Sequence, residues 1–371
     1  MCQETTRDLA LTSSFSRMVV ASNVETDEDF VKALGDGRFS FLKLDVSDFA
    51  KLVDTMKGYD MVVSGLPHKW DMQVAEAAIE AKINGLDISG HVDPSKLGEA
   101  AKRAGITFVS GVGATPGVTN VLAKHGANKL DQVDEVHYHW AAYRCFAPSP
   151  GLVATTFWEF DPYLKDRYYY DSGEFHCVPP FSGAKKVRFA DPIGEQEVYF
   201  VPHSETLTTP HSMKGVKKVD VRGTWPPETM RLLRAMIDFG LFEKEPTKTG
   251  NLSTSPREFM AEFLLQTPRA KDITLWGYAI NVEVIGKKAG KNTKCTFATS
   301  HPPMEKWGGK RAYAKNVGIP MSIGAQLIAN GRVKRKGVLP SDEAFEPQEF
   351  FQELSKRGIR VHEHVEETYT Y

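Results

Sequence analysis

The sequence has few cysteines, no long hydrophobic run and almost no net charge. Its four cysteines lie far apart without a Cys-x-x-Cys pair, which predicts reduced thiols and a cytoplasmic protein. No apolar run approaches the roughly 18 residues that a membrane helix needs, and the polar first residues do not resemble a secretion signal. Lys and Arg number 46 against 47 Asp and Glu. This balance argues against a nucleic-acid or membrane-surface partner.

The segment 60–117 alternates short strand-like runs with helical patterns. Runs rich in β-branched residues end at Ser64, Asp87 and Ser110, and the segments between them carry apolar residues at helical spacing. This alternation predicts an α/β fold with a parallel sheet and right-handed crossovers. The same pattern begins upstream, with helices expected at 3–11, 27–34 and 46–56 and strands at 17–22 and 39–44. Ligands of such sheets bind beyond the carboxyl ends of the strands.

A Rossmann-type sheet should open with a strand and a Gly-x-Gly-x-x-Gly turn, whose glycines let a pyrophosphate approach the first helix. This sequence begins at the helix instead, and Cys2 stands where the third glycine would fall. Two explanations stay open. The sequence can be a shortened form of a dinucleotide enzyme, or the protein has lost its phosphate site.

The remaining nucleotide positions indicate the cofactor weakly. NAD-binding domains of this type carry an acidic residue that binds the 2′-hydroxyl of the ribose. At that position this sequence has Ser22 and Asn23. The missing carboxylate favours NADP slightly over NAD, although no Lys or Arg follows, and turn residues at a strand end explain the pair equally well. Asp45 can reach an adenine edge or cap a helix. The expected cofactor-binding residues are Ser22, Asn23, Asp45, Val46, Gly65, Leu66, Pro67, Asp87 and Ser89.

After Gly117 the α/β alternation stops. The following pattern predicts an α+β region on a mixed sheet, and a polar, turn-rich surface loop at 291–309. Strands are expected at 135–143, 168–178, 185–189, 197–201, 217–221 and 273–285, and helices at 118–130, 228–239, 256–265, 319–330 and 347–357.

Several stretches follow one another in a recognisable order along nearly the whole chain: 60–67, 74–81 with 86–89, 113–120, 202–210, and 318–325 with 337–340. They resemble the saccharopine dehydrogenase-like family, and most closely its lysine 6-dehydrogenase branch. The resemblance implies a Rossmann-like domain at 1–117 and 311–371, interrupted by a substrate-binding and dimerisation domain at 118–310. It also implies a homodimeric, NAD(P)-dependent oxidoreductase acting on the CH–NH2 or CH–NH group of a lysine- or saccharopine-like amino acid. The absent glycine turn departs from the family and puts cofactor binding in doubt.

Oxidising an amine requires a base for its proton and polar partners for the substrate. His203 and Glu205 follow a predicted strand and are the first catalytic candidates, the histidine for proton transfer and the glutamate for a substrate ammonium. A polar turn explains them equally well. Asp87, a further catalytic candidate, and His91 lie at a strand's carboxyl end, where a hydrogen-bonding anchor is the alternative.

Four further residues are candidates for substrate binding. Trp158 and Glu159 could form a pocket wall facing a cationic group, although an amphipathic helix with Trp158 in the core is also expected. Arg144 could bind a carboxylate bidentately, and Thr208 belongs to one of the matching stretches. His137 and His139 share one strand face, but no third ligand supports a metal site, so they are expected to be exposed.

Two other functions remain open. In the first, the protein would be an enzyme that reduces a Schiff base to a carboxyalkylated polyamine, as carboxynorspermidine dehydrogenase does. A catalytically silent homodimeric scaffold would keep the fold without the phosphate turn.

Overall fold

The computed structural model describes residues 1–250, 252–271 and 273–368, and the chain folds as two units. The first comprises Met1–Val121 and Ala314–Arg357, and the second comprises Leu122–Tyr313 and the segment from Gly358 onward. The sequence-based division assigned 311–371 to the Rossmann-like domain. In the structure, the final strand β17 (Arg360–Thr368) pairs with a strand of the second unit instead.

The first unit alternates strands and helices as predicted. Its elements are α1 (Cys2–Thr12), β1 (Met18–Ser22), α2 (Thr26–Leu34), β2 (Phe39–Lys43), α3 (Phe49–Met56), β3 (Met61–Ser64), α4 (Asp71–Ala81), β4 (Asn84–Asp87), α5 (Pro94–Ala104), β5 (Thr107–Ser110), α11 (Ala312–Ala329), β16 (Gly337–Pro340), α12 (Ser341–Ala344) and α13 (Pro347–Lys356). All described strand pairs in this unit are parallel, which confirms the predicted α/β class.

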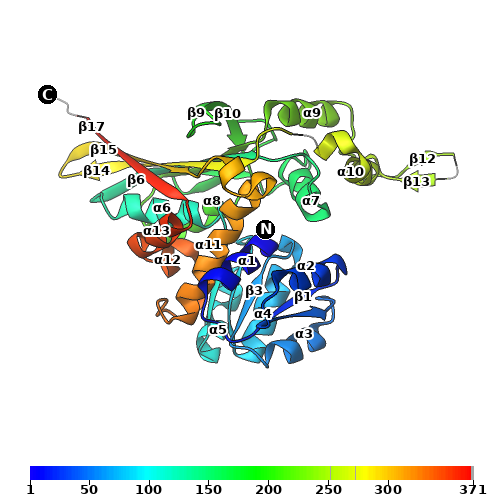
Figure 1. Cartoon of the computed structure of the whole chain (residues 1–371). Helices are drawn as coiled ribbons and strands as arrows, with labels where there is room; N and C mark the ends of the chain where they lie inside the picture. Colours follow the sequence, from blue (N-terminus) through cyan, green and yellow to red (C-terminus); the bar gives the residue numbers. More distant parts are fainter. Residues whose placement is uncertain (251, 272, 369–371) are drawn as a thin grey trace. The chain divides into compact units, whose positions relative to one another are not determined.

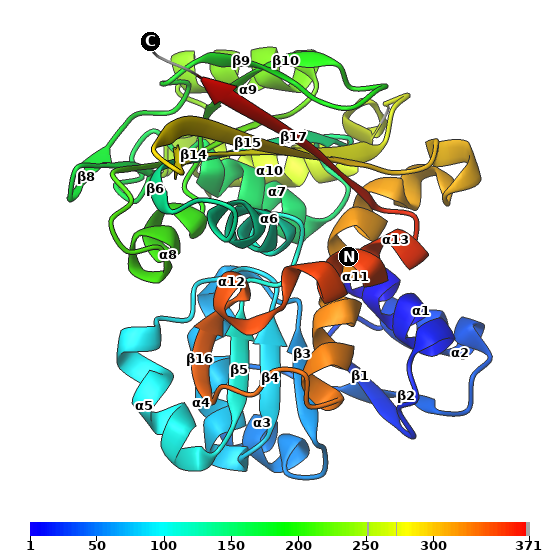
Figure 2. The same cartoon turned by 90° about the vertical axis from the view of Figure 1, so that its left-hand side faces the viewer.

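These strands form two sheets. One contains β1 and β2, and the other has the order β16-β5-β4-β3. Figure 2 shows β1 and β2 apart from the four-stranded sheet. Strands β4 and β5 have buried side chains along most of their length, whereas β1 and β3 are mostly half-buried.

The helices around the four-stranded sheet bury the positions that the sequence pattern selects. Val74, Ala77 and Ala78 of α4 and Ala101 of α5 belong to one hydrophobic core with Phe108. Helix α5 begins at an Asp cap with proline in its first turn and ends at a glycine in the left-handed conformation. The capping residues of α5 and the buried positions of α4 and α5 therefore agree with the sequence pattern.

Helix α1 packs against α11, which lies more than 300 residues later. Thr5 donates a 3.0 Å hydrogen bond to the Gly318 carbonyl, and the Ser322 hydroxyl donates to Asp8 at 2.6 Å. Arg357 pairs with the same aspartate at 2.9 Å. A Cβ at Gly318 would lie 2.8 Å from the Met1 carbonyl oxygen, so the contact requires glycine.

The second unit is an α+β arrangement on a nine-stranded mixed sheet. Its elements are α6 (Val118–Ala127, which crosses the boundary), β6 (Gln132–Tyr143), α7 (Pro150–Glu159), β7 (Tyr168–Asp171), β8 (Glu174–Cys177), β9 (Lys185–Arg188), β10 (Glu195–Phe200), α8 (Glu205–Ser212), β11 (Lys218–Thr224), α9 (Pro227–Asp238), β12 (Thr247–Thr249), β13 (Leu252–Thr254), α10 (Pro256–Gln266), β14 (Gly277–Lys288), β15 (Lys291–Ser300) and β17. The main path is β17-β15-β14-β6-β11-β10-β9, with β6 and β11 parallel and the other pairs antiparallel.

The two faces of this sheet have different cover. Figure 1 shows α6 and α8 below the sheet and α9 above it, on the side toward which its last strands, β10 and β9, extend. Gly126 of α6 packs so closely that a Cβ there would lie 2.7 Å from Val284 and 2.8 Å from Phe297. On the opposite face, Val187 and Val198 join a core with Ala141 and other buried residues.

The predicted surface loop at 291–309 is wrong over its first ten residues, because β15 occupies them. Only one face of this strand is buried, and that face carries Thr293, Cys295, Phe297 and Thr299. Two threonines on the buried face keep the segment polar in composition, so its strand alternation is hard to detect.

The predicted single strand at 168–178 is also wrong, because Ser172 and Gly173 form a two-residue turn between β7 and β8. Both have positive φ, 51° and 100°, as a type I′ hairpin requires. Glycine alone does not distinguish such a turn from a strand residue.

The expected exposure of His137 and His139 is wrong too, because both are buried on the sheet. Nδ1 of His137 lies 2.7 Å from Asp220, and Nε2 lies 3.0 Å from Glu135. Burial and the Lys185 charge lower the pKa of His139 to about 3. Charged side chains from β6, β9 and β11, rather than solvent, surround these two histidines.

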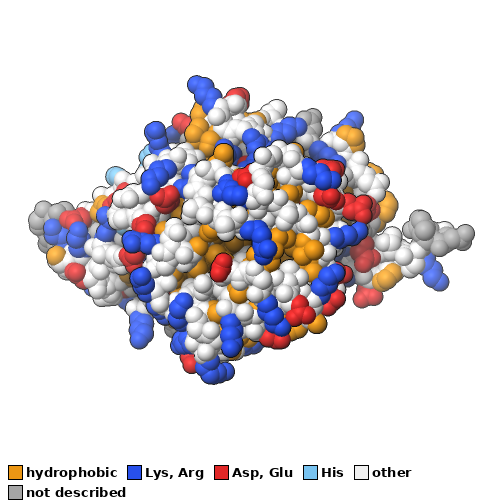
Figure 3. All heavy atoms as spheres, turned by 60° about the horizontal axis from the view of Figure 1, so that its bottom comes forward, with side chains coloured by type: hydrophobic (Ala, Val, Ile, Leu, Met, Phe, Trp, Pro, Cys, Tyr) orange, Lys and Arg blue, Asp and Glu red, His pale blue; other side chains and the backbone are white. Residues whose placement is uncertain are grey.

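The outer surface carries both signs of charge. In the face shown in Figure 3, Lys and Arg side chains are interspersed with Asp and Glu around a central group of hydrophobic side chains. Within the part of the chain that the structure describes, no helix is both long enough and apolar enough to cross a membrane.

Candidate active site

Asp87 anchors the loop at the carboxyl end of β4. Its side chain is fully buried, and Oδ1 accepts hydrogen bonds from the backbone N–H groups of Ser89 at 2.8 Å, Gly90 at 2.7 Å and Gly111 at 3.2 Å. Burial raises the pKa of Asp87, although these hydrogen bonds oppose the rise. The structure therefore gives Asp87 the anchoring role, while its catalytic role stays a prediction.

A second buried carboxylate, which the sequence analysis missed, lies nearby in the first turn of α4. Asp71 is fully buried, and its Oδ2 lies 3.9 Å from Nδ1 of His91. Burial, followed by the Asp87 charge, raises the pKa of Asp71 to about 8. The His91 ring also contacts the His68 ring at 5.1 Å between centroids. His91 thus lies beside the Asp71 carboxyl group. Its predicted contact with the substrate stays a prediction.

The other predicted cofactor residues lie at strand ends of the first unit and form local turns. The Ser22 hydroxyl accepts from the Val24 N–H at 3.1 Å. Asp45 accepts from the Ser47 backbone and hydroxyl at 2.9 and 2.8 Å, and this turn lowers its pKa. The helix cap of α3 is Asp48, so neither Asp45 nor Ser47 fills that role.

Cys2 contacts the loop that follows β3. Its Sγ lies 3.5 Å from the Gly65 carbonyl oxygen, and a Cβ at Gly65 would lie 2.0 Å from that sulfur. Leu66 packs against the core of the unit, and Val46 accepts a hydrogen bond from Gln73 through its carbonyl. Asn23 and Pro67 are exposed.

In the second unit, the strongest group of titratable residues surrounds His203. Nε2 of His203 lies 3.2 Å from Glu159, and Nδ1 lies 3.7 Å from Glu205. Glu159 comes from the end of α7 and Glu205 from the start of α8, and both glutamates are buried. Burial lowers the pKa of His203, but the Glu159 hydrogen bond and both carboxylate charges outweigh it and raise that pKa. His203 was expected beside a strand end, and it lies between β10 and α8, buried rather than displayed.

A row of aromatic rings extends from this histidine to Arg144. Trp140 stacks on His203 at 5.4 Å and on Tyr278 at 6.0 Å, and Tyr278 contacts Tyr313 at 5.7 Å. The Arg144 guanidinium lies 5.7 Å from the Tyr313 ring centroid. Sequence analysis missed Trp140 and Tyr313, because isolated aromatic residues in apolar segments resemble ordinary core residues.

Arg144 is buried with neutral hydrogen-bond partners. It donates to the Thr156 hydroxyl at 2.7 Å and to the carbonyls of Cys145 and Phe146, each at 3.0 Å. Thr156 lies on α7, one turn before Glu159. The structure therefore brings the predicted residues Arg144, Glu159, His203 and Glu205 into one buried region of the second unit.

The remaining candidates lie at the border of this region. Trp158 is half-buried on α7, while its neighbour Phe157 is the fully buried aromatic residue of the pair. Thr208 lies on α8, and its hydroxyl is buried without a hydrogen-bond partner. Neither placement tests the predicted substrate contact.

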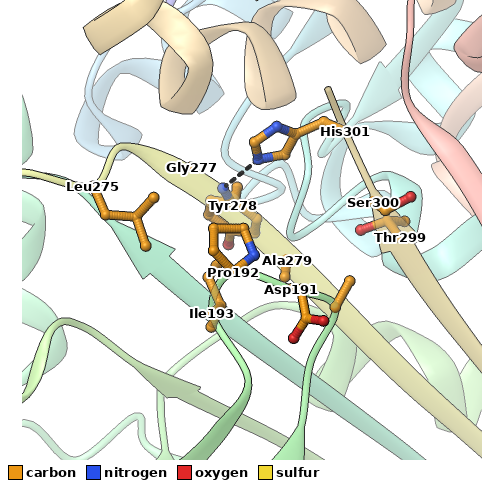
Figure 4. A pocket seen from close by; sticks show the side chains of 11 residues that line it. Asp191, Pro192, Ile193, Leu275, Gly277, Tyr278, Ala279, Thr299, Ser300 and His301 are labelled. Atoms are coloured by element: carbon orange, nitrogen blue, oxygen red, sulfur yellow. Dashed lines mark hydrogen bonds between the residues drawn. The ribbon is translucent and has the colours of Figure 1, made fainter. Parts of the chain in front are cut away.

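A separate small hollow opens beside β14 (Figure 4). The His301 ring projects over it, with Nδ1 donating to the Pro302 carbonyl at 2.8 Å and Nε2 accepting from the Tyr278 N–H. Burial lowers the pKa of His301, so the ring is a neutral structural group. Leu275, Pro192 and Ile193 give the hollow apolar walls, and Asp191, Thr299 and Ser300 add polar side chains.

Among residues 1–250, 252–271 and 273–368, no cluster of three or more His, Cys, Asp or Glu side chains could hold a metal ion. The four cysteines are free thiols, two exposed and two buried.

Comparisons with known proteins decide the family. Residues 1–109 match the saccharopine dehydrogenase NADP binding domain, and residues 113–359 match the saccharopine dehydrogenase C-terminal domain. The chain belongs to the saccharopine dehydrogenase family. The predicted resemblance is thereby confirmed at family level, and its lysine 6-dehydrogenase branch stays a prediction.

Similar proteins of this family cover most of the chain. A saccharopine dehydrogenase [NADP(+), L-glutamate-forming] from Pyricularia oryzae is 33% identical, covering 87% of this chain and 88% of its own. A carboxyaminopropylagmatine dehydrogenase from Synechocystis sp. is 22% identical, covering 96% and 93%. The structure of apo saccharopine dehydrogenase (L-Glu forming) from Saccharomyces cerevisiae has a TM-score of 0.69 at 17% identity, covering 98% of this chain and 97% of that one. This last likeness concerns the fold.

The NADP-binding domain of the saccharopine dehydrogenase family implies a dinucleotide, and the residues present fit it only in part. The ribose position holds Ser22 and Asn23 without an acid, which is compatible with NADP. The space beside Gly65, at the end of β3, fits a pyrophosphate poorly, because the Cys2 side chain fills it.

Proposed function

We propose that this saccharopine dehydrogenase family member is an NAD(P)-dependent oxidoreductase that binds the amine of an amino-acid substrate between Glu159 and Glu205. The observation that carries the proposal is the buried His203 imidazole with a carboxylate on each side, 3.2 and 3.7 Å away. Buried carboxylates are stable in charged form only beside cations. We place the substrate ammonium beside this group of His203 and two carboxylates.

His203 is the group that holds or moves the amine proton. Its raised pKa keeps it able to accept and release a proton near neutral pH. Trp140 stacks on one face of the ring and fixes its plane. The two glutamates then direct the ring nitrogens, so the proton can pass between His203 and a bound amine.

Arg144 would bind a substrate carboxylate. Its guanidinium is buried, and its hydrogen-bond partners are a hydroxyl and two carbonyl groups. A buried cation without a charged partner favours an anionic ligand. An amine site and a carboxylate site together favour lysine or a saccharopine-like substrate. Saccharopine is also the substrate in the name of the Pyricularia oryzae relative.

A second candidate is reduction of a Schiff base to a carboxyalkylated polyamine. Relatives named carboxyaminopropylagmatine dehydrogenase and carboxynorspermidine synthase favour it. The two buried glutamates would suit a carboxyalkylated polyamine, which carries several ammonium groups and only one carboxylate. Saccharopine instead requires more than one carboxylate partner.

Calorimetric titration of this chain tests the proposal without relying on turnover. We expect saccharopine or lysine to bind with micromolar affinity, and Glu205→Gln and Arg144→Gln each to weaken binding at least tenfold. Glu245→Gln, at an exposed position, is the matched control. Binding of a carboxyalkylated polyamine alone would support the second candidate. If none of these ligands binds, the remaining explanation is the catalytically silent scaffold.

A homodimer and a cytoplasmic location complete the proposal. The edge strand β17 leaves most of its side chains exposed, and such an edge can pair with another copy about a two-fold axis. Four free thiols suit a reducing compartment. Light scattering of the purified chain tests the dimer, and fractionation of cells tests the location.

A further inference from the structure

Two buried tryptophans of the second unit hold indole N–H groups without an acceptor. Trp140 lies in β6 and Trp225 follows β11, and each residue is only 2% exposed. Within the part of the chain that the structure describes, neither Nε1 has a hydrogen-bond partner. Buried indole N–H groups usually find one, as Trp276 does by donating to the Ile273 carbonyl at 3.3 Å. Two unpaired buried donors therefore require an explanation.

The two indoles contact each other edge to face. Their centroids lie 4.6 Å apart, with an angle of 82° between the ring planes. Gly223, two residues before Trp225, pairs in register with Trp140, and a Cβ at this glycine would lie 2.3 Å from Cε2 of that indole. Because Cε2 is bonded to Nε1, the edge of Trp140 that carries the N–H group lies over β11, the strand that leads into Trp225. Both donors are therefore in one small region of the core.

This pair of indoles lies beside the proposed amine site. His203 stacks on Trp140 at 5.4 Å between centroids, and Glu159 lies 3.2 Å from the histidine. Oε2 of Glu159 is buried and has no hydrogen-bond partner among the described residues. Unpaired donors and an unpaired carboxylate oxygen thus lie around one histidine. Since an indole N–H group only donates and an ionised carboxylate only accepts, a ligand that satisfies both needs an acceptor and a donor.

We propose that the indole N–H groups of Trp140 and Trp225 bind the carboxylate of an amino-acid head group, in which the amine and the carboxylate share one carbon. The amine on that carbon faces Glu159, as in the proposed function, on which this inference rests. A carboxylate has two acceptor oxygens, one for each indole, and hydrogen bonds to a charged acceptor are stronger than those between neutral groups. The zwitterionic head group adds no net charge to a region that already holds buried carboxylates.

The indole subsite lies apart from Arg144, which the proposed function assigns to a substrate carboxylate. Trp140 stacks on Tyr278 at 6.0 Å, Tyr278 contacts Tyr313 at 5.7 Å, and the arginine lies 5.7 Å beyond. The second unit then has two carboxylate partners, a neutral pair beside His203 and a cation at the other end of the aromatic row. Stacking also fixes the plane of the Trp140 ring before a ligand binds, which lowers the entropy cost of binding.

The indole signals of the intact chain test the subsite directly. In a proton–nitrogen correlation spectrum, the assigned signals of Trp140 and Trp225 should move downfield on saturation with L-lysine or saccharopine. The signal of Trp276 should stay in place, because its N–H group is already bonded. Cadaverine, which is lysine without its carboxylate, should move none of the three. Lysine binding in calorimetry without a shift of Trp140 and Trp225, or equal shifts with cadaverine, would overturn the inference while the amine site stands.

Sodium acetate is a probe that needs no amine site, with sodium chloride as the ionic control. Increasing acetate should move the signals of Trp140 and Trp225 saturably. If acetate moves them but no amino acid binds, the carboxylate subsite stands and the proposed function fails. If neither acetate nor any of the amino acids moves them, the inference is overturned.

A matched set of variants measures what the two donors contribute. Trp140→Phe and Trp225→Phe each keep an aromatic ring and remove the N–H group, so lysine binding should weaken about fivefold or more. Cadaverine binding to these variants should stay within about twofold of the parent chain, and Trp276→Phe should leave both ligands within about twofold. Equal weakening of both ligands would show that the indoles only shape the pocket, and would overturn the inference. If a Phe variant does not fold, the spectra of the parent chain still decide.

Discussion

Nε2 of His203 lies 3.2 Å from Oε1 of Glu159, and both side chains are shielded from water. The carboxylate therefore favours the protonated ring. We predict that Glu159→Gln lowers the pKa of His203, measured by NMR titration of the ring. Glu245→Gln is the control. An unchanged titration would show that Glu205 alone sets the pKa.

The same pair should affect stability in one pH range. A raised histidine pKa stabilises the folded state fully below the unfolded value of about 6.5, and the contribution is lost as pH rises through the folded pKa. The loss of unfolding free energy in Glu159→Gln should thus be larger at pH 5.5 than at pH 8.5. A pH-independent difference in urea unfolding would contradict this.

Asp71 should destabilise the protein at alkaline pH. Its pKa is raised to about 8 by burial and by Asp87, whereas an unfolded aspartate ionises near 4, at about 3.9. The unfolded chain therefore releases this proton first, and stability falls as pH rises from about 4 to 8. We predict that Asp71→Asn raises the melting temperature at pH 8 more than at pH 5. Asp54→Asn on the exposed face of α3 should show no such trend.

Removing the Asp87 anchor should cost substantial stability. Asp87→Ala leaves three backbone N–H groups without their acceptor, and each orphaned donor costs about 1 kcal/mol or more. We predict a loss of about 3 kcal/mol in chemical denaturation. Asp93→Ala, which removes one helix-cap bond, should cost about 1 kcal/mol. Equal losses would mean that the loop rearranges around the missing carboxylate.

The parallel unit was predictable from sequence because its strands are short apolar runs, of which β4 and β5 are buried along most of their length. Apolar runs ending at Ser64, Asp87 and Ser110 carry a strong local signal, and the glycine after α5 marks its end. In the second unit only one face is buried at many positions. The buried face of β15 includes threonines, so its alternation of polar and apolar residues is weak. β17 carries charged residues along an exposed edge.

The candidate site was predictable in composition but not in contacts. His203 and Glu205 are neighbours in sequence, whereas Glu159 reaches them from 44 residues away. Trp140 and Asp71 gave no signal, because their roles depend on what the fold places beside them. Glu159 was identified through its residue type, and its pairing required the structure.

The attachment of α1 to α11 has a consequence for synthesis on the ribosome. Thr5 and Asp8 emerge from the exit tunnel long before Gly318, Ser322 and Arg357 exist. The nascent first helix must therefore wait without its partner until most of the chain has been translated. The first unit can therefore close around α1 only near the end of translation.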